Sequence, residues 1–225
     1  MMPVAPSDAP TPSRRTRRGD ERDVQLRQRA SELFLERGYD RVSLDEIVRD
    51  VGGSKTNVYT FYGGKDRLFV IVMDQMIREI VEPLQSVILD GLGLAAGLDR
   101  FAQTLLDVLL QERHLAFQRL VIAEALRHPE IGWNWYHHGP QASHAVLERF
   151  LCEKRSAGHI RATTDPARAA KLFHDMVAFD LLNRAMMAID GGPTPDDVAL
   201  TIRDAVTTMT EALGTSPEKM PSAEP

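Results

Sequence analysis

The side chains best suited to chemistry in this sequence are short polar and basic ones gathered between residues 43 and 68. Ser43 stands three residues before Glu46. In this arrangement the hydroxyl can accept from the Glu46 backbone N–H, and the carboxylate can return to the N–H of Ser43. An apolar stripe with helical spacing follows. Gly52-Gly53 ends that helix, because glycine takes the left-handed cap conformation without steric hindrance.

Ser54 can then cap a second, short helix over about residues 55–61. A helix, a glycine turn and a short second helix form the helix-turn-helix layout, in which the second helix enters the major groove of DNA. Because asparagine can pair with adenine and threonine methyls can contact thymine, we expect base-edge contacts from Thr56, Asn57 and Thr60. Phosphate contacts are expected from Ser43, Lys55, Tyr59, Tyr62 and Lys65, and Ser54 completes the predicted DNA-binding set as the cap. The alternatives are core packing for Tyr59 and a solvated ammonium for Lys65.

Charge and cysteine content limit the class of protein. The chain carries a net charge of −5, but residues 1–67 hold 13 Lys or Arg against 11 Asp or Glu, and only the remainder is acidic. A mildly basic head on an acidic body is expected if the head alone meets phosphate. A single cysteine, Cys152, excludes an intrachain disulfide and suits a reducing cytoplasm. Neither a secretory signal nor an apolar run long enough for a membrane span is found, so no membrane partner is expected.

Helical periodicity runs through most of the chain, with about nine helices and no convincing strand alternation, so the predicted fold is all-α. Residues 1–19, rich in proline and arginine, are expected to form a disordered basic arm, which either reaches DNA or stays solvated. We predict a helix-turn-helix domain over 20–66, a helical body over 67–214 and a disordered tail over 215–225. Pro83 must kink or end the long helix that starts near residue 65.

Residues 25–70 resemble the DNA-binding domain of the TetR family of bacterial transcription regulators. The positions that match the family pattern are Leu33, Phe34, Gly38, Tyr39, Ser43, Ile47, Gly52, Ser54, Tyr59, Lys65 and Leu68. Gly53 departs from it, standing where valine is usual. The resemblance implies a homodimeric regulator, commonly a repressor, that binds a palindromic operator of double-stranded DNA.

Residues 120–180 resemble the C-terminal domain of the AefR-like branch of that family. The matching positions are Glu124, Pro129, Gly139, Pro140, Gly158, Ile160, Arg161, Asp165, Pro166, Ala169, Ala170 and Phe173. This resemblance implies a domain that binds a small-molecule effector and forms the homodimer through the last two helices, about 166–189 and 195–213. It implies no particular ligand.

Large apolar and aromatic side chains of the body are candidates for an effector pocket, which is typically apolar with a few hydrogen-bonding groups. They are Phe101, Phe117, Trp133, Trp135, Tyr136, His137, Phe173, Met176 and Phe179. The segment 133–138 is the densest in aromatic and imidazole groups and is the first choice for ligand contact. The alternative for each of these residues is an ordinary place in the core.

Two apolar stripes in the last two helices can pack as a four-helix bundle between subunits. They comprise Phe173, Val177, Leu181, Met186 and Ile189, then Val198, Ile202, Val206 and Met209. The alternative is that they close the core of their own subunit.

Other chemistries find little support in the sequence. His137, His138 and His144 lack the spacing of a zinc site, so no metal is expected, and no cofactor is predicted. Because no nucleophile elbow, phosphate loop or Rossmann glycine pattern is present, we do not expect an enzyme. The favoured function is a repressor released from its operator by a small, largely apolar effector. The alternatives are a helical carrier with a vestigial DNA-binding head, and an activator or global DNA binder.

Overall fold

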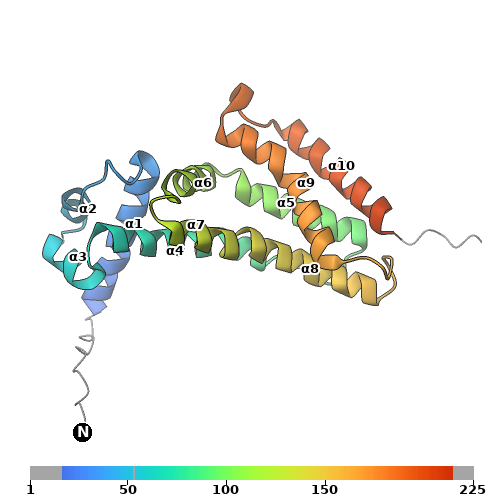
Figure 1. The fold of residues 1–225 in the computed structure, drawn as a ribbon, viewed down its shortest axis with the longest axis horizontal. Coiled ribbons are helices and arrows are strands. Elements are labelled where there is room, and N and C mark those ends of the chain that lie inside the picture. The colour runs from blue at the N-terminus through green and yellow to red at the C-terminus, as the bar shows by residue number, and fades with distance from the viewer. Residues whose placement is uncertain (1–16, 53, 215–225) are drawn as a thin grey trace, which may run out of the picture.

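The computed structural model describes residues 17–52 and 54–214, and all regular structure within them is helical (Figure 1). The α-helices are α1 (Arg17–Arg37), α2 (Leu44–Val51), α3 (Lys55–Tyr62), α4 (Lys65–Gln85), α5 (Leu94–Leu109), α6 (Glu112–Glu124), α7 (Pro129–His138), α8 (Pro140–Ser156), α9 (Pro166–Met186) and α10 (Pro195–Leu213), and a 3₁₀ turn, η1 (Ile189–Gly191), follows α9. The all-α prediction is confirmed. The described residues form ten α-helices where about nine were predicted. The stretch from 129 to 157 is divided between Gly139 and Pro140, because a proline begins α8.

The predicted terminal segments fall mostly outside this range. Residues 1–16 of the basic arm, Gly53 and the tail from residue 215 are not among the described residues, whereas Arg17 already belongs to α1. None of the helices that are described is long and apolar enough to cross a membrane.

The N-terminal helices form a small head around an aromatic cluster. The ring of Phe34 from α1 lies 4.9 Å from that of Phe69 on α4, and the Tyr39 ring lies 4.8 Å from Phe69. Gly38, at φ +76°, ends α1 and turns the chain so that Tyr39 folds back onto this cluster. Ile47 of α2 completes the fully buried centre of the head.

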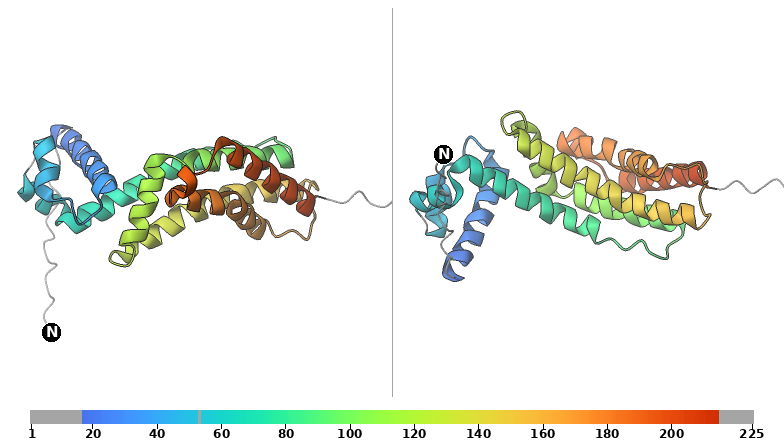
Figure 2. Two further views of the ribbon diagram at one scale, coloured as in Figure 1. Left: turned by 90° about the horizontal axis from the view of Figure 1, so that it is seen from above. Right: turned by 60° about the horizontal axis from the view of Figure 1, so that its bottom comes forward.

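Helix α4 leaves the head and continues along the body, which is built from α5 to α10 (Figures 1 and 2). The head lies at one end of the molecule and the C-terminal end of α10 at the other. Pro83 does not stop α4 at once, since the helix continues to Gln85. The core of the body includes Phe101, Phe117 and Phe173, all completely buried.

Gly97 marks the closest packing between two helices of the body. A Cβ atom at this position of α5 would lie 2.1 Å from Cζ of Phe150, a side chain of α8 that is itself buried. The glycine therefore lets the Phe150 ring lie against the backbone of α5.

We expect Gly97→Ala to lower the free energy of unfolding by about 1–3 kcal/mol, because a buried ring must move to admit one methyl group. Urea denaturation would measure the loss. Phe150→Leu removes the clashing ring, so the double variant should lose less than the sum of the two single losses. Strictly additive losses would show that the Phe150 ring is not the cause of the destabilisation by Gly97→Ala.

Candidate nucleic-acid interface and effector cavity

Both helices of the helix-turn-helix begin at a serine cap. Oγ of Ser43 accepts from the backbone N–H of Glu46 at 3.3 Å, and Oγ of Ser54 accepts from the N–H of Asn57 at 3.2 Å. The carboxylate of Glu46 accepts from the guanidinium of Arg37 instead, so the reciprocal capping predicted from the sequence forms in one direction only. The caps fix where α2 and α3 start.

Helix α3 presents a polar face because Val58 anchors its other side in the core of the head. The exposed residues of α3 include five of the predicted DNA contacts: Lys55, Thr56, Asn57, Tyr59 and Thr60. Tyr59 is 58% exposed, so the alternative of core packing is not what the structure shows. These side chains are free of the core and form one continuous polar helix surface.

Two local interactions position side chains on that surface. Nζ of Lys55 lies 2.6 Å from Oδ2 of Asp45 on α2, and the hydroxyl of Thr60 donates to the carbonyl of Thr56 at 2.8 Å. An exposed ion pair contributes little to stability, so its lysine can leave the carboxylate for another anion. Lys55 is thus held near the surface of α3 but can turn to a phosphate.

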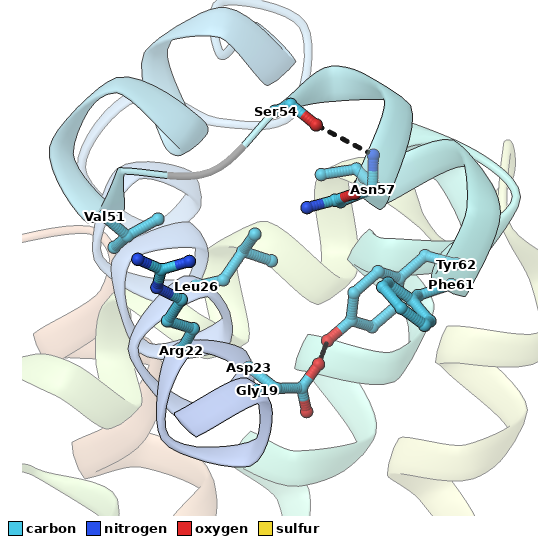
Figure 3. Close-up of a pocket in the computed structure, with 10 residues that line it drawn as sticks. Gly19, Arg22, Asp23, Leu26, Val51, Ser54, Asn57, Phe61 and Tyr62 are labelled. Carbon is cyan, nitrogen blue, oxygen red and sulfur yellow. Dashed lines mark hydrogen bonds between the residues drawn. The ribbon is translucent and has the colours of Figure 1, made fainter. Parts of the chain in front are cut away.

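Tyr62 and Lys65 point back into the head. Tyr62 is buried and its hydroxyl donates to Asp23 on α1, as the dashed line in Figure 3 shows. This corrects the expectation of a phosphate contact for Tyr62, because the hydroxyl holds α3 against α1. Nζ of Lys65 lies 4.0 Å above the centre of the Tyr39 ring, and burial lowers the pKa of this ammonium group.

The space between α1 and α3 is a small cavity of about 150 Å³ (Figure 3). Asn57 and Arg22 both line it, and the amide of Asn57 points into it in Figure 3. Phe61, 49% exposed beside this cavity, was absent from the predicted DNA contacts. A phenylalanine on a short amphipathic helix is normally assigned to the core, so its exposure could not be predicted from the sequence.

The predicted effector residues divide into three groups. Phe101, Phe117 and Phe173 are completely buried in the body. Trp135 packs its ring 5.1 Å from that of Phe117 in an edge-to-face pair. The remainder face outward: Trp133 with His137 stacked on it at 4.0 Å, Tyr136, and Met176 and Phe179 on α9. Trp135 of the segment 133–138 packs on the core and lines an internal cavity of the body.

The internal cavity of the body that Trp135 lines has a volume of about 60 Å³. Its walls come from α4 to α9, and the lining residues are Ile80, Val81, Leu84, Leu105, Leu109, Gln118, Trp135, Gly139, Pro140, Ser143, His174 and Leu182. Pockets that enclose drug-sized ligands are several times larger, at roughly 300–1,000 Å³. A ligand of that size therefore requires the surrounding helices to separate.

Buried polar atoms near the cavity lack partners. Within the part of the chain that the structure describes, Oε1 of Gln118 and both ring nitrogens of His114 make no hydrogen bond. The His114 ring lies 5.5 Å from Trp135, and burial lowers the pKa of His114 to about 4. The imidazole is therefore neutral near pH 7 and offers one donor and one acceptor. Such groups are normally satisfied, so these atoms are available to a polar group of a ligand.

The stripes expected to join two subunits are partly used within one subunit. Val177 and Leu181 are buried in their own chain, as the alternative reading of the sequence allowed. A different stripe on α9 remains exposed: Leu172 at 50%, Met176 at 41% and Phe179 at 73%. Their spacing of four and three residues places them on one face of the helix.

The body touches the head at the turn between α6 and α7 as well as through α4. Arg127 donates to Oδ1 of Asp40 at 2.6 Å. The ring of His128 lies 5.1 Å from Tyr39 and 5.5 Å from Phe69, edge-on to both. A movement of α7 therefore reaches the core of the head directly.

Comparison with known proteins places this arrangement in a family. Residues 26–71 match the family described as bacterial regulatory proteins of the tetR family, and residues 96–215 match the AefR-like transcriptional repressor, C-terminal domain. The chain belongs to the TetR family of transcription regulators. Its C-terminal domain is of the AefR-like type, which spans more than half of the chain.

Solved structures show the same fold over nearly the whole chain. A TetR-family transcriptional regulator from Mesorhizobium loti is 27% identical with a TM-score of 0.77, covering 89% of this chain and 100% of its own. The Flavonoid-responsive Regulator FrrA is 25% identical with a TM-score of 0.74, covering 88% of this chain and 100% of its own.

A shorter match is to the HTH-type transcriptional activator FasR of Mycolicibacterium smegmatis. It is 33% identical over 69 residues, which is 31% of this chain and 32% of that relative. The match therefore spans about a third of the relative's length.

Proposed function

We propose that this regulator represses transcription by binding a palindromic operator as a homodimer and is released by a small, largely apolar effector. The observation that carries the proposal is the exposed polar face of α3, from Lys55 to Thr60, held on a buried anchor. Asn57, Thr56 and Thr60 would read base edges, while Lys55 and Tyr59 would contact phosphate. Ser43 and Ser54 would support the phosphate contacts from helix N-termini. Lys65 would reach a phosphate by turning away from the Tyr39 ring. A vestigial head would have no need of this polar surface, which argues against a mere carrier.

Release from the operator would follow because the effector cavity is too small to admit a ligand without opening. A cavity of about 60 Å³ admits a ligand only if its walls move apart. Those walls include Trp135 on α7, and His128, the residue directly before α7, packs on Tyr39 of the head. An effector that prefers the opened body would thereby favour a head orientation unsuited to DNA, and the operator affinity would fall by its differential binding.

The chemistry of the cavity supports an aromatic effector with at least one polar group. Leu84, Leu105 and Trp135 supply apolar contact. The side-chain oxygen of Gln118, which has no partner within residues 17–52 and 54–214, can accept from a hydroxyl. The name of the similar regulator FrrA records a response to flavonoids. We therefore propose polyphenols of the flavonoid class as the first effectors to test.

The proposed dimer uses the outer face of α9 together with α10. Leu172, Met176 and Phe179 give it an exposed apolar stripe, and Leu200 on α10 is 45% exposed. A two-fold pairing of these helices would present two α3 helices to the half-sites of an inverted repeat.

Selection of genomic fragments by the full-length protein, followed by sequencing, tests DNA recognition. We expect enrichment of a few sites that share an inverted repeat. Asn57→Ala should weaken binding to such a site about 5- to 150-fold, the range for one well-placed base contact. Lys55→Ala should weaken binding more evenly across sequences and reduce the slope of log affinity against log salt by about 1.

Lys171→Ala is the matched control, because Lys171 is also exposed and also lies 2.6 Å from an aspartate, but on the body. Operator affinity should be unchanged in this variant. Uniform enrichment of fragments, or full affinity in both α3 variants, would contradict recognition through α3.

Tryptophan fluorescence can locate the effector, because the chain has only two tryptophans. Trp133→Phe leaves Trp135 in the cavity wall, and Trp135→Phe leaves the exposed Trp133. A flavonoid that releases the operator should quench the first protein and leave the second nearly unchanged. Gln118→Leu should weaken the binding of that flavonoid by up to about tenfold, because one hydrogen bond is lost. Quenching confined to Trp133 would place the effector elsewhere.

Phe179→Asp should convert the dimer to a monomer at micromolar concentration, because a charge would enter the apolar centre of the interface. Sedimentation equilibrium would measure the change. Ile88→Asp is the matched control, since Ile88 is also 73% exposed but lies beyond the end of α4. A Phe179→Asp protein that remains dimeric would exclude this face.

Activation of transcription is the second candidate, favoured by the match of 69 residues to the activator FasR. A reporter gene behind an enriched site distinguishes the two functions. Expression that rises when the regulator is removed indicates repression, and expression that falls indicates activation.

A further inference from the structure

Two histidines from neighbouring helices meet beside the internal cavity. His144 lies in the first half of α8 and His174 near the middle of α9, and their rings stand edge-to-face with centres 4.6 Å apart. Asp175 completes the group: one nitrogen or carboxylate oxygen from each of the three residues lies within 4.8 Å of the others. The sequence did not reveal this group, because 29 residues separate the two histidines along the chain.

The bonding of these groups leaves ligand atoms available. Nε2 of His144 is buried and has no hydrogen-bond partner among the residues that the structure describes. Nδ1 of His174 lies at a long 3.4 Å from Oδ1 of Asp175. A neutral imidazole is the form that binds a metal ion.

We propose that His144, His174 and Asp175 bind a first-row divalent transition-metal ion such as Zn²⁺ or Co²⁺. Two imidazoles and a carboxylate form a donor set that suits such ions, with water completing the coordination. An ion holds these donors at about 2.0–2.2 Å, so small rotations of the rings must bring them closer than they lie in the structure. His144 Nε2 has no hydrogen-bond partner among the described residues, so none of those bonds is broken in this movement.

Lys171 fits an outer position in the site. Its Nζ donates to Oδ2 of Asp175 at 2.6 Å, which leaves Oδ1 facing His174. Groups that hydrogen-bond a ligating carboxylate orient it toward the ion. The positive charge of Lys171 opposes the cation, so the affinity should be lower than that of a closed structural zinc site.

Metal binding at this site would join α8 to α9. His174 also lines the internal cavity, together with Ser143, the residue before His144. The ion would therefore fix one wall of the cavity, and it would do so whether or not the effector proposal above is correct.

Titration of the full-length chain, free of any histidine tag, with Co²⁺ tests the site. We expect visible absorption from one bound ion per chain, displacement of that ion by Zn²⁺, and a Tm that rises with the Zn²⁺ concentration. His144→Phe and His174→Phe keep a ring in place and should each weaken binding by at least about tenfold. Asp175→Asn should also weaken it, and it is a safe variant for folding because Asp175 is exposed.

The matched control is the double variant His137→Phe/His138→Phe, which removes two histidines of α7, one half-buried and one exposed, and should bind Co²⁺ within about twofold of the original protein. Absence of saturable Co²⁺ binding would overturn the proposal. The proposal would also be overturned if Asp175→Asn, His144→Phe and His174→Phe all bound Co²⁺ as tightly as the original protein does, or if the control variant lost Co²⁺ binding.

Discussion

The packing of α4 along both the head and the body is the constraint on which the rest of the structure depends. Phe69, in its second turn, closes the aromatic cluster of the head, while Ile80 and Leu84 line the cavity of the body. A continuous helix resists bending because its backbone hydrogen bonds would have to stretch. Head and body therefore cannot reorient independently, and the turn at Arg127 and His128 adds a second connection. Under the proposed function, this double attachment is what converts a change in the body into a change in the spacing of the two α3 helices.

The fold could be predicted from the sequence because its main signals are local. The caps at Ser43 and Ser54 and the glycine stops involve atoms within a few residues of each other, so their outcome barely depends on the remaining structure. Apolar spacing then fixes which face of each helix turns inward. The break between α7 and α8 was harder to predict, because Pro140 is tolerated in the first turn of a helix and does not by itself show that the preceding helix has ended.

The placement of individual site residues depends on tertiary packing and was less predictable. Tyr59 and Tyr62 are three residues apart on one short helix, yet the first is exposed and the second is buried against Asp23. Trp133 and Trp135 likewise face opposite ways on α7. Each pair has the same residue type, so composition could not separate them. Only the direction from which a neighbouring helix approaches decides which ring it covers.

The small volume of the internal cavity has a consequence for how sensitive the regulator can be. If the form that accepts effector is a minor fraction of the molecules, the apparent Kd equals the intrinsic Kd divided by that fraction. Under the proposed function, tight closure around Trp135 and Leu84 would set a concentration threshold, below which the operator would stay occupied. Residues that close the cavity would tune this threshold without contacting either ligand, and two chains with the same contact residues could respond to the same compound at very different concentrations.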